Sequence, residues 1–487
     1  MFFSVYSLGC KLNSLEGEAI TDSFGRESFC LLPWNASGTA LLYIVNTCTV
    51  TSMADQKARR VIRKILREKP EACVIITGCY AQLDQAALAA LAEDIPGSIR
   101  RLFVVPGDRK DSLLDLPRFL KELSSFNEAS EASLPDTISS FFEQADHHGD
   151  GSFRYKPETF SFHSRSYIKI QDGCDRSCTY CRVSIARGKS RSLGKEKVLE
   201  EINALEAHGY SEAVLTGVNI SQYRDGETGL AGFLGYLLEG SNNIRFRLSS
   251  IEPEALNIEL IKAIRNERIR PHFHLSVQSG SAEVLEKMGR PYTPACVKKA
   301  INDLRTIRDD PFLACDIIAG FPGESERDFE ETCELCESTG FAWIHAFPFS
   351  PRPGTAAYTF PGKVNEREVS HRVERLVSLA GKGRQDYIKR WAGKEVEAVI
   401  ETPAEAALKK LPYGYVPATS ENYLKLLVFH GSEPAPTPGR FVRCRIQAGT
   451  GDLQVPPAFD AFADISCLTS PSRKPGTPYM PCKGRSC

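Results

Sequence analysis

The sequence predicts an α/β protein with three folded parts: a parallel α/β sheet domain at the amino terminus, a central βα barrel or partial barrel, and a small β-barrel near the carboxyl end. Three observations support this prediction. The chain has 487 residues, which is too many for one compact core. Short apolar runs alternate with helical patterns along most of its length. Beyond residue 394 the segments become strand-like, with Gly and Pro between them.

The composition is that of an ordinary globular protein and excludes general disorder, since 42% of the residues are hydrophobic and 25% are charged. The 60 basic and 61 acidic side chains leave a formal net charge of -1, so a polyanionic partner must be met by a local basic patch. The opening residues lack the features of a secretory leader, and no apolar run approaches the roughly 20 residues that span a bilayer. Sixteen cysteines in such a chain point to metal or redox sites. We therefore expect a cytoplasmic protein without a membrane partner.

Residues 1–108 are expected to form the amino-terminal domain. Apolar runs that alternate with helical patterns predict its parallel strands at Phe2–Leu8, Leu41–Asn46, Val74–Thr77 and Leu102–Val105. Between the second and third of these runs, Met53–Lys69 carries apolar residues at helical spacing and basic residues elsewhere on its surface. We expect a strongly basic amphipathic helix, which either contacts RNA or is a solvated face.

The rest of the chain divides at changes in composition. Residues 109–165 are polar and are interpreted as a linker or insertion. Residues 166–385 contain a second βα series whose strands predict a barrel or partial barrel: Tyr167–Gln171, Ala213–Thr216, Arg245–Ser249, His272–Ser276, Ala314–Ile318 and Trp343–Phe347. Residues 386–450 predict a small β-barrel. The tail, 451–487, is rich in Pro, Ser and Lys, which favours disorder.

A compact set of three cysteines follows the first strand of the central series. Cys174, Cys178 and Cys181 lie within eight residues, directly after Tyr167–Gln171. Thiolates suit zinc or iron–sulfur clusters, but a structural zinc site normally needs four protein ligands, and no fourth Cys or His stands at suitable local spacing. Three ligands on a four-iron cluster leave one iron open for another molecule. Packing cysteines are the alternative, which this spacing in a polar loop disfavours.

This loop resembles the signature of radical S-adenosylmethionine enzymes, including the aromatic Tyr180 before the last cysteine. The resemblance implies that Cys174, Cys178 and Cys181 hold a 4Fe-4S cluster, that the open iron binds S-adenosylmethionine, and that electron transfer yields a 5′-deoxyadenosyl radical. Polar or glycine-bearing runs follow the later strands, where barrel active sites are built. These runs resemble the family's cofactor-binding loops. The residues expected to lie near S-adenosylmethionine are Tyr180, Ser249, Glu252, Ser276 and Gln278.

The cysteines of a second set are far apart in the sequence but occupy equivalent positions after predicted strands. Cys10, Cys48 and Cys79 each fall just beyond a predicted strand of the amino-terminal sheet. The carboxyl ends of parallel strands meet at one edge, where open α/β folds place ligands, so these thiols could converge on a second cluster. Buried cysteines are also common as small hydrophobes, and placement alone does not choose between the two interpretations.

The residues around this second set resemble the amino-terminal domain of methylthiotransferases: Gly9-Cys10-Lys11-Leu12-Asn13, Asn46-Thr47-Cys48-Thr49-Val50 and Thr77-Gly78-Cys79-Tyr80-Ala81-Gln82. With residues 172–192 and a carboxyl end that looks like a TRAM RNA-binding domain, the resemblance covers nearly all of residues 1–450. It implies a second 4Fe-4S cluster, on Cys10, Cys48 and Cys79, that carries or accepts sulfur. It also implies S-adenosylmethionine as both methyl donor and radical source.

Lys11-Leu12-Asn13 looks most like the branch of this family that methylthiolates N6-threonylcarbamoyladenosine in tRNA, at C2 of the base beside the anticodon. Replacing an unactivated aromatic C–H fits radical chemistry. The alternatives are the same chemistry on N6-isopentenyladenosine in tRNA or on a ribosomal protein and, in another class, an RNA-binding iron–sulfur protein without catalysis. To reach a buried site, the target base must be splayed out of the anticodon loop.

The expected partners are tRNA, an electron donor of the flavodoxin or ferredoxin type, and a sulfur donor. Because the net charge is near zero, RNA contacts should be local. The candidate regions are the basic run after the cysteine loop, the helix at Met53–Lys69 and the carboxy-terminal β-domain. The individual residues expected to contact RNA are Arg187, Lys189, Arg191, Tyr423 and Lys425.

Overall fold

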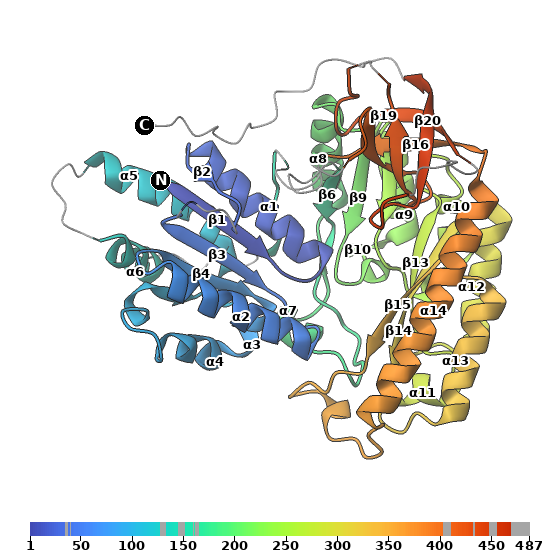
Figure 1. The fold of residues 1–487 in the computed structure, drawn as a ribbon, viewed down its shortest axis with the longest axis horizontal. Coiled ribbons are helices and arrows are strands. Elements are labelled where there is room, and N and C mark those ends of the chain that lie inside the picture. The colour runs from blue at the N-terminus through green and yellow to red at the C-terminus, as the bar shows by residue number, and fades with distance from the viewer. Residues whose placement is uncertain are drawn as a thin grey trace.

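The computed structural model arranges the chain as three packed parts, coloured from blue to red along the sequence in Figure 1. The amino-terminal sheet domain lies beside the central barrel, and the small β-barrel lies at one end of the central barrel. The residues that the structure describes are 1–34, 38, 40–126, 133–144, 151–158, 160, 165–402, 411–431, 434–447 and 455–468.

Within the described residues, five parallel strands form the amino-terminal sheet in the order β2-β1-β3-β4-β5. Four of them confirm the predicted strands: β1 (Phe2–Ser7), β3 (Leu42–Thr47), β4 (Cys73–Gly78) and β5 (Leu102–Val104). The sequence does not predict the edge strand β2 (Cys30–Leu31), because two residues have no detectable periodicity. Every residue of β3 and β4 is buried, as expected of central strands with helices on both faces.

Helices cover both faces of this sheet: α1 (Lys11–Arg26), α2 (Ser52–Glu68), α3 (Cys79–Leu83) and α4 (Gln85–Ala89). Ile44 shares a core with residues of α1, and Val45 shares the opposite core with residues of α2. Successive residues of one strand therefore face different layers. The predicted basic helix is confirmed as α2, and its start is fixed by the Thr51 side chain, which accepts a hydrogen bond from the Ala54 N–H.

The segment 109–165 is not a linker where the structure describes it. It forms η3 (Lys110–Leu114), α5 (Leu116–Phe126), α6 (Leu134–Gln144) and η4 (Gly151–Phe153). Apolar side chains from this segment enter the same core as α1: Leu113, Leu116, Leu120, Ile138, Phe141 and Tyr155. The polar composition hid them because α5 and α6 are amphipathic and keep polar side chains on the outward face. The segment therefore extends the amino-terminal domain.

In the described chain, six parallel strands form the central part: β6 (Ser166–Lys169), β9 (Glu212–Thr216), β12 (Arg245–Leu248), β13 (His272–Gln278), β14 (Phe312–Ala319) and β15 (Trp343–Pro348). Pairing runs β6-β9-β12 and β13-β14-β15, and single bridges from Phe246 to Ile269 and from Ile251 to Leu275 join the two sheets. The end strands β6 and β15 are not paired with each other within the described residues. The predicted six strands are confirmed, and they form a partial barrel.

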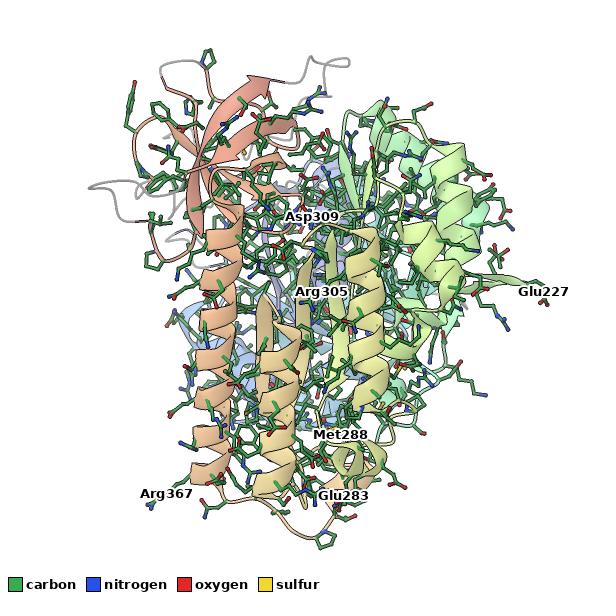
Figure 2. All side chains as sticks on the ribbon, turned by 90° about the vertical axis from the view of Figure 1, so that its right-hand side faces the viewer. Glu227, Glu283, Met288, Arg305, Asp309 and Arg367 are labelled. Carbon is green, nitrogen blue, oxygen red and sulfur yellow. The ribbon has the colours of Figure 1, made fainter. Side chains whose placement is uncertain are left out.

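Helices pack on the outer face of this partial barrel: α8 (Lys195–Ala207), α9 (Leu230–Gly240), α10 (Ile258–Ile264), α11 (Ala282–Lys287), α12 (Pro294–Ile307), α13 (Glu326–Thr339) and α14 (Glu366–Trp391). Figure 2 shows α12, α13 and α14 side by side, with Arg305 on α12 and Arg367 at the start of α14. Among the helices that the structure describes, none combines the length and the apolar character that crossing a membrane requires.

A small closed barrel forms the carboxy-terminal part of the described chain. Its strands in spatial order are β16 (Glu395–Ile400), β17 (Tyr415–Ser420), β18 (Lys425–Phe429), β20 (Ala461–Leu468) and β19 (Phe441–Ile446). The predicted barrel is confirmed, but its predicted end at residue 450 is wrong, because β20 comes from the tail that was expected to be disordered. β20 pairs with both β18 and β19, which closes the barrel and removes two open sheet edges. Residues 469–487 lie outside the described residues.

Candidate active site

The barrel cysteines, which are Cys174, Cys178 and Cys181, occupy a loop between β7 (Gln171–Asp172) and α7 (Val183–Arg187). The loop begins at Gly173, whose φ of +73° lies in the left-handed region. A Cβ atom at this position would lie 2.0 Å from the Lys189 carbonyl oxygen. Only glycine therefore lets the chain turn here without displacing the backbone that follows the cysteines.

Each thiol of this loop accepts a hydrogen bond from an N–H group. The donors, with their distances to the sulfur, are the Arg176 backbone to Cys174 (3.4 Å), the Val183 backbone to Cys181 (3.4 Å) and the Arg290 guanidinium to Cys178 (3.5 Å). Such donors stabilise thiolates that ligate iron–sulfur clusters. Burial raises the pKa of Cys181 to about 11 and also raises the pKa of Cys174, so these thiols remain protonated at neutral pH until a metal centre displaces the proton.

The three cysteines line a cavity of about 310 Å³ at the carboxyl ends of the barrel strands. Most of the residues expected to lie near S-adenosylmethionine also line it: Tyr180, Glu252, Ser276 and Gln278. Ser249, the fifth residue of this prediction, is buried and is not among the residues that line the cavity, whereas the next residue, Ser250, lines it.

Glu252 is held by two arginines, Arg176 and Arg290, whose role was not predicted from the sequence. Arg176 donates to Glu252 from two nitrogens, at 3.0 and 2.7 Å, and Arg290 donates at 2.9 Å. Burial would raise the pKa of Glu252, but hydrogen bonds from Arg176 and Asn219 and the charge of Arg290 outweigh it and lower the pKa. Arg176 could have been noticed as a basic residue inside the cysteine loop. Arg290 lies 112 positions from Cys178 and has no comparable signal.

The second cysteine set lies at the carboxyl ends of β1, β3 and β4, which are neighbours in the sheet. Cys48 and Cys79 directly follow β3 and β4, and Cys10 comes shortly after the end of β1. Gly9, with a φ of +97°, lies so close to Cys48 that a Cβ atom on it would be 2.4 Å from the Cys48 sulfur. Burial, to which the nearby Cys10 and Cys79 add, raises the pKa of Cys48 to about 12. The three thiols therefore lie close enough to influence one another.

These thiols share the hydrogen-bonding pattern of the barrel cysteines: Cys10 accepts from the Asn13 backbone, Cys48 from the Val50 backbone and Cys79 from the Arg187 side chain. Across the part of the chain that the structure describes, no three Cys, His, Asp or Glu side chains are close enough together to bind a single metal ion.

Arg187 does not contact solvent in the way that RNA binding requires. Its side chain is 8% exposed and donates to the Cys79 sulfur at 3.3 Å, to Glu16 at 3.0 Å and to Asp172 at 3.1 Å. The contact between α7 and α3 places Arg187 against the amino-terminal domain. The RNA-binding prediction for Arg187 is therefore wrong, and the residue instead joins the regions of the two cysteine sets.

Tyr423 and Lys425 are also engaged inside the protein. The Tyr423 ring stacks on His272 with the ring centroids 4.0 Å apart, where the small barrel contacts the central one. Lys425 is half-buried and pairs with Glu401 at 3.4 Å. The RNA-binding prediction for these two residues is not supported, because their polar and aromatic groups already have partners in the fold. By contrast, the remaining predicted RNA contacts are exposed, namely Lys189 and Arg191.

The cavity at the barrel cysteines also has a wall from the amino-terminal domain. Val50 and Thr51, which come soon after Cys48, line it together with the barrel cysteines. The Arg352 guanidinium, beyond β15, donates to the Thr49 hydroxyl at 2.6 Å and so fastens this loop to the barrel. The loops that carry both cysteine sets therefore border one cavity.

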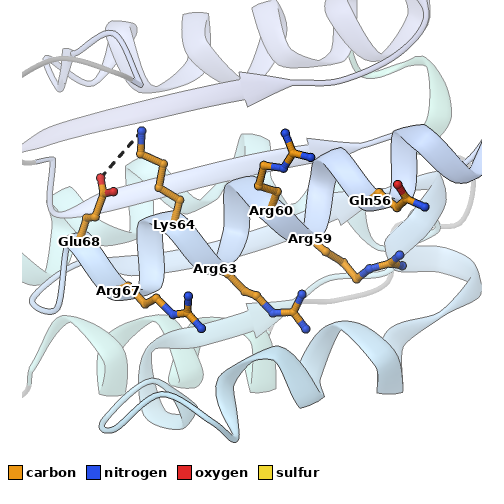
Figure 3. A pocket seen from close by; sticks show the side chains of 7 residues that line it. All are labelled: Gln56, Arg59, Arg60, Arg63, Lys64, Arg67 and Glu68. Atoms are coloured by element: carbon orange, nitrogen blue, oxygen red, sulfur yellow. Dashed lines mark ion pairs between the residues drawn. The ribbon is translucent and has the colours of Figure 1, made fainter.

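A basic surface lies on α2, and we call it the basic face. It consists of Arg59, Arg60, Arg63, Lys64 and Arg67. Figure 3 shows these side chains extending from one helix, with a single ion pair drawn, between Lys64 and Glu68 at 4.0 Å. Arg59 donates to the Tyr80 hydroxyl at 2.6 Å, and Tyr80 is the residue after Cys79. The basic face thus begins beside the second cysteine set.

Family models match two parts of the chain. Residues 168–336 match the Radical SAM superfamily, and residues 3–97 match the Uncharacterized protein family UPF0004. The first range contains the barrel cysteines and the second contains the other set.

Known relatives match nearly the full chain. The threonylcarbamoyladenosine tRNA methylthiotransferase MtaB of Treponema pallidum is 38% identical over 91% of this chain and 97% of its own length. The protein of the same name from Thermotoga maritima is 36% identical, over 82% of this chain and 86% of its own. A tRNA-2-methylthio-N(6)-dimethylallyladenosine synthase from Anaplasma phagocytophilum is 30% identical over the same shares. Among solved structures, the radical S-adenosylmethionine methyltransferase TsrM from Kitasatospora setae is 15% identical, with a TM-score of 0.46, over 73% of this chain and 76% of that one.

Proposed function

The chain belongs to the radical S-adenosylmethionine tRNA methylthiotransferases, and we propose that it inserts a methylthio group at C2 of N6-threonylcarbamoyladenosine beside the anticodon. Relatives named for this nucleoside are 38% and 36% identical, whereas a relative named for the dimethylallyl nucleoside is 30% identical. The motif Lys11-Leu12-Asn13 supports the same branch.

One observation carries this proposal: a single cavity is bordered by the loops of both cysteine sets. Val50 and Thr51 reach it from the Cys48 loop, and the barrel cysteines line it directly. Replacing a C–H bond by a C–S bond needs the radical source and the sulfur source at the same base atom. Holding the reactants together in this way supplies a large part of the rate enhancement of such a step.

The barrel cysteines would hold a 4Fe-4S cluster with S-adenosylmethionine at its open iron. When bound and reduced by the electron donor, the cluster would supply one electron to cleave the C–S bond of S-adenosylmethionine, which gives methionine and a 5′-deoxyadenosyl radical. Around it, the chain provides a charged carboxylate at Glu252 and neutral polar groups at Ser276 and Gln278 to orient the cofactor. Gln278 has a φ of +68°, which costs a non-glycine residue about 1 kcal/mol or more and is typical of functional sites.

We propose that Cys10, Cys48 and Cys79 hold a second 4Fe-4S cluster, at which the sulfur is made available. The buried Arg187 guanidinium would stabilise the thiolates of this set, because it already donates to the Cys79 sulfur. The basic face of α2, together with Lys189 and Arg191, would bind the phosphates of tRNA. An electron donor of the flavodoxin or ferredoxin type and a sulfur donor complete the reaction, in the cytoplasm.

Iron content tests the two-cluster arrangement. The protein purified without oxygen should contain about eight irons per chain, from two four-iron clusters. A Cys79→Ala variant should retain about four irons and still cleave S-adenosylmethionine with dithionite, whereas Cys178→Ala should form no 5′-deoxyadenosine. About four irons in the unaltered protein would contradict the second cluster.

Nucleoside mass spectrometry tests the substrate. In a strain without this gene, methylthiolated N6-threonylcarbamoyladenosine should disappear from tRNA and return on complementation. If it persists and the methylthiolated isopentenyl nucleoside disappears, the enzyme belongs to that branch. If no methylthiolation changes, neither tRNA nucleoside is the substrate.

A further inference from the structure

A second cavity, which we call the side cavity, lies beside the second cysteine set. It measures about 290 Å³ and is lined by Cys79 and Arg187, and within the described chain it shares no lining residue with the active-site cavity at the barrel cysteines. Its volume is several times the roughly 30 Å³ that one water molecule occupies. Exposed residues at its rim, among them Asp108 and Ile185, connect it with the solvent. A small molecule can therefore reach Cys79 without passing through the active-site cavity.

Three parts of the fold build the side cavity. The amino-terminal sheet domain supplies Cys79, and the central part of the chain supplies Lys169 and Arg187. Another wall comes from the described part of residues 109–165, through Lys110 and Tyr155. The segment whose polar composition predicted a linker thus borders the second cysteine set.

Three buried cations in the side cavity share two carboxylates. The side chains of Lys110, Lys169 and Arg187 line the cavity and are only 4%, 3% and 8% exposed. The Glu16 carboxylate accepts hydrogen bonds from all three. Asp172 pairs with Lys169 at 2.5 Å and with Arg187 at 3.1 Å. These five groups therefore carry one positive charge in excess.

The other charged groups of the lining do not remove this excess. Asp111 is buried, but it is paired with Arg154 at 3.3 Å. Asp108 and Arg191 are exposed at the rim, where water weakens the effect of their charges. A buried excess of positive charge favours an anionic ligand.

The Tyr155 hydroxyl is a hydrogen-bond donor without a partner. Tyr155 lines the side cavity and is 4% exposed, and its hydroxyl makes no hydrogen bond to any residue that the structure describes. The ammonium groups of Lys110 and Lys169 lie 5.4 and 5.6 Å from the centroid of its ring. An unpartnered buried hydroxyl costs free energy, and a ligand that accepts its hydrogen bond removes that cost. Because Arg187 already donates to the Cys79 sulfur, an added anion would meet the tyrosine and the two lysines.

We propose that the side cavity binds hydrosulfide, through the Tyr155 hydroxyl and the ammonium groups of Lys110 and Lys169, and so supplies sulfur at Cys79. This inference rests on the proposed second cluster. Every methylthiolation removes one sulfur atom from the protein, so the sulfur must be replaced in each turnover. In the proposed function the target base occupies the active-site cavity, whereas the side cavity gives access from another direction. Hydrosulfide is small and anionic, and it keeps its oxidation state on binding, so this step needs no reductant.

Selenium uptake tests the binding site, because hydroselenide is an anion of the same kind and elemental analysis detects it. The holoenzyme is incubated without oxygen with increasing hydroselenide, separated from unbound anion by gel filtration, and analysed for selenium and iron per chain. Tyr155→Phe should raise the half-saturating concentration roughly ten- to a hundredfold, the loss of one hydrogen bond to a charged group. An unchanged half-saturating concentration would overturn the binding site.

Two measurements distinguish this binding role from a structural one. The free energy of unfolding of Tyr155→Phe should not fall, since the hydroxyl that is removed has no partner among the described residues. Tyr413→Phe is the matched control, because Tyr413 is 91% exposed and does not line the side cavity. It should change neither the half-saturating concentration nor the stability.

A pair of substitutions at Ile185 tests the route. Ile185 lines the side cavity and is 50% exposed, so both variants should fold. Ile185→Glu should slow selenium uptake roughly two- to tenfold because it repels the anion at the rim, whereas Ile185→Lys should not slow it. The difference should shrink at about 1 M salt, where charges are screened beyond about 3 Å. Equal uptake rates in the two variants at low salt would overturn the route.

Cys79→Ala separates this inference from the proposed function, since its selenium content gives the uptake without the second cluster. About four irons in the unaltered enzyme, with uptake no higher than in Cys79→Ala, would show that the second cluster itself is wrong. About eight irons and Cys79-dependent uptake, which neither Tyr155→Phe nor Ile185→Glu reduces, would leave the second cluster standing and refute the side cavity alone.

Discussion

The Nε atom of Arg187 lies 3.3 Å from the sulfur of Cys79, although the two residues are 108 positions apart in the chain. Arg187 ends the helix after the barrel cysteines, and Cys79 begins the helix after β4 of the amino-terminal sheet. One buried side chain therefore connects the helix after the barrel cysteines to the second cysteine set. Its positive charge also compensates the buried carboxylates of Glu16 and Asp172.

Replacing Arg187 by Met should destabilise the contact between the two domains. The change leaves Glu16 and Asp172 buried with less compensating charge, and removing one partner of a buried ion pair costs about 3–5 kcal/mol. Urea unfolding followed by circular dichroism measures this loss. Arg367→Met is the matched control, because Arg367 is exposed and its loss should stay within about 0.5 kcal/mol. Similar unfolding midpoints for the two variants would contradict the structural role of Arg187.

Gly9→Ala should prevent the second cysteine set from assembling. A methyl group there would lie 2.4 Å from the Cys48 sulfur, in a backbone conformation with a φ of +97°. Iron content should fall from about eight to about four per chain. Gly97→Ala also has a positive φ, of +72°, but its Cβ would meet nothing within 4 Å. That control should lose only about 1 kcal/mol of stability and no iron, and equal iron in all three proteins would refute the steric argument.

Substitutions on the basic face should weaken tRNA binding mainly at low salt. Each phosphate contact that is lost should reduce the slope of log affinity against log salt by about 0.7–0.9. Arg63→Gln and Arg67→Gln, made together, test this through filter binding at several salt concentrations. The control is Arg118→Gln on α5, where the arginine side chain is 69% exposed but lies outside the basic face. A slope that both variants leave unchanged would identify the basic face as a solvated surface.

The ion pairs of Glu212 should make the free energy of unfolding decrease as the pH is lowered. Burial would raise the pKa of Glu212, but Arg247 and Arg270 outweigh it and lower the pKa to about 2. A lowered carboxyl pKa contributes stability that is present above the unfolded-state pKa, near 4.5, and is lost as the pH falls toward 2. The contribution is about 3 kcal/mol. Unfolding measured from pH 6 to pH 2 should show a shallower loss in Glu212→Gln, and an equally steep loss would assign the acid sensitivity to other groups.

The strands and the cysteines were predictable because each depends on local pattern. Buried parallel strands are continuous apolar runs, and Cys10 and Cys48 follow such runs closely enough that their common sheet edge could be inferred. Composition failed where amphipathic elements are embedded in polar sequence. Leu116 and Ile138 belong to a core in a segment interpreted as a linker, and β20 closes a barrel from a Pro-rich tail.

Charged residues show the limit of local pattern most clearly. Arg187 and Tyr423 are residue types that commonly contact RNA, yet both are packed between domains. Arg290 reaches Cys178 and Glu252 from far along the chain, and nothing near it in sequence indicates this role. The fate of a charged side chain depends on which distant carboxylate or thiol the fold brings to it.

The sequence by itself determined the order of the three folded parts, the two sets of cysteines at strand ends, and the basic helix. Only the tertiary structure decided that the loops carrying both sets border one cavity, and that Arg187, which follows the barrel cysteines, contacts Cys79. Strand periodicity and short motifs are local properties, so they can be read along the chain. The meeting of side chains from separate domains is set by packing between surfaces, which no local pattern encodes.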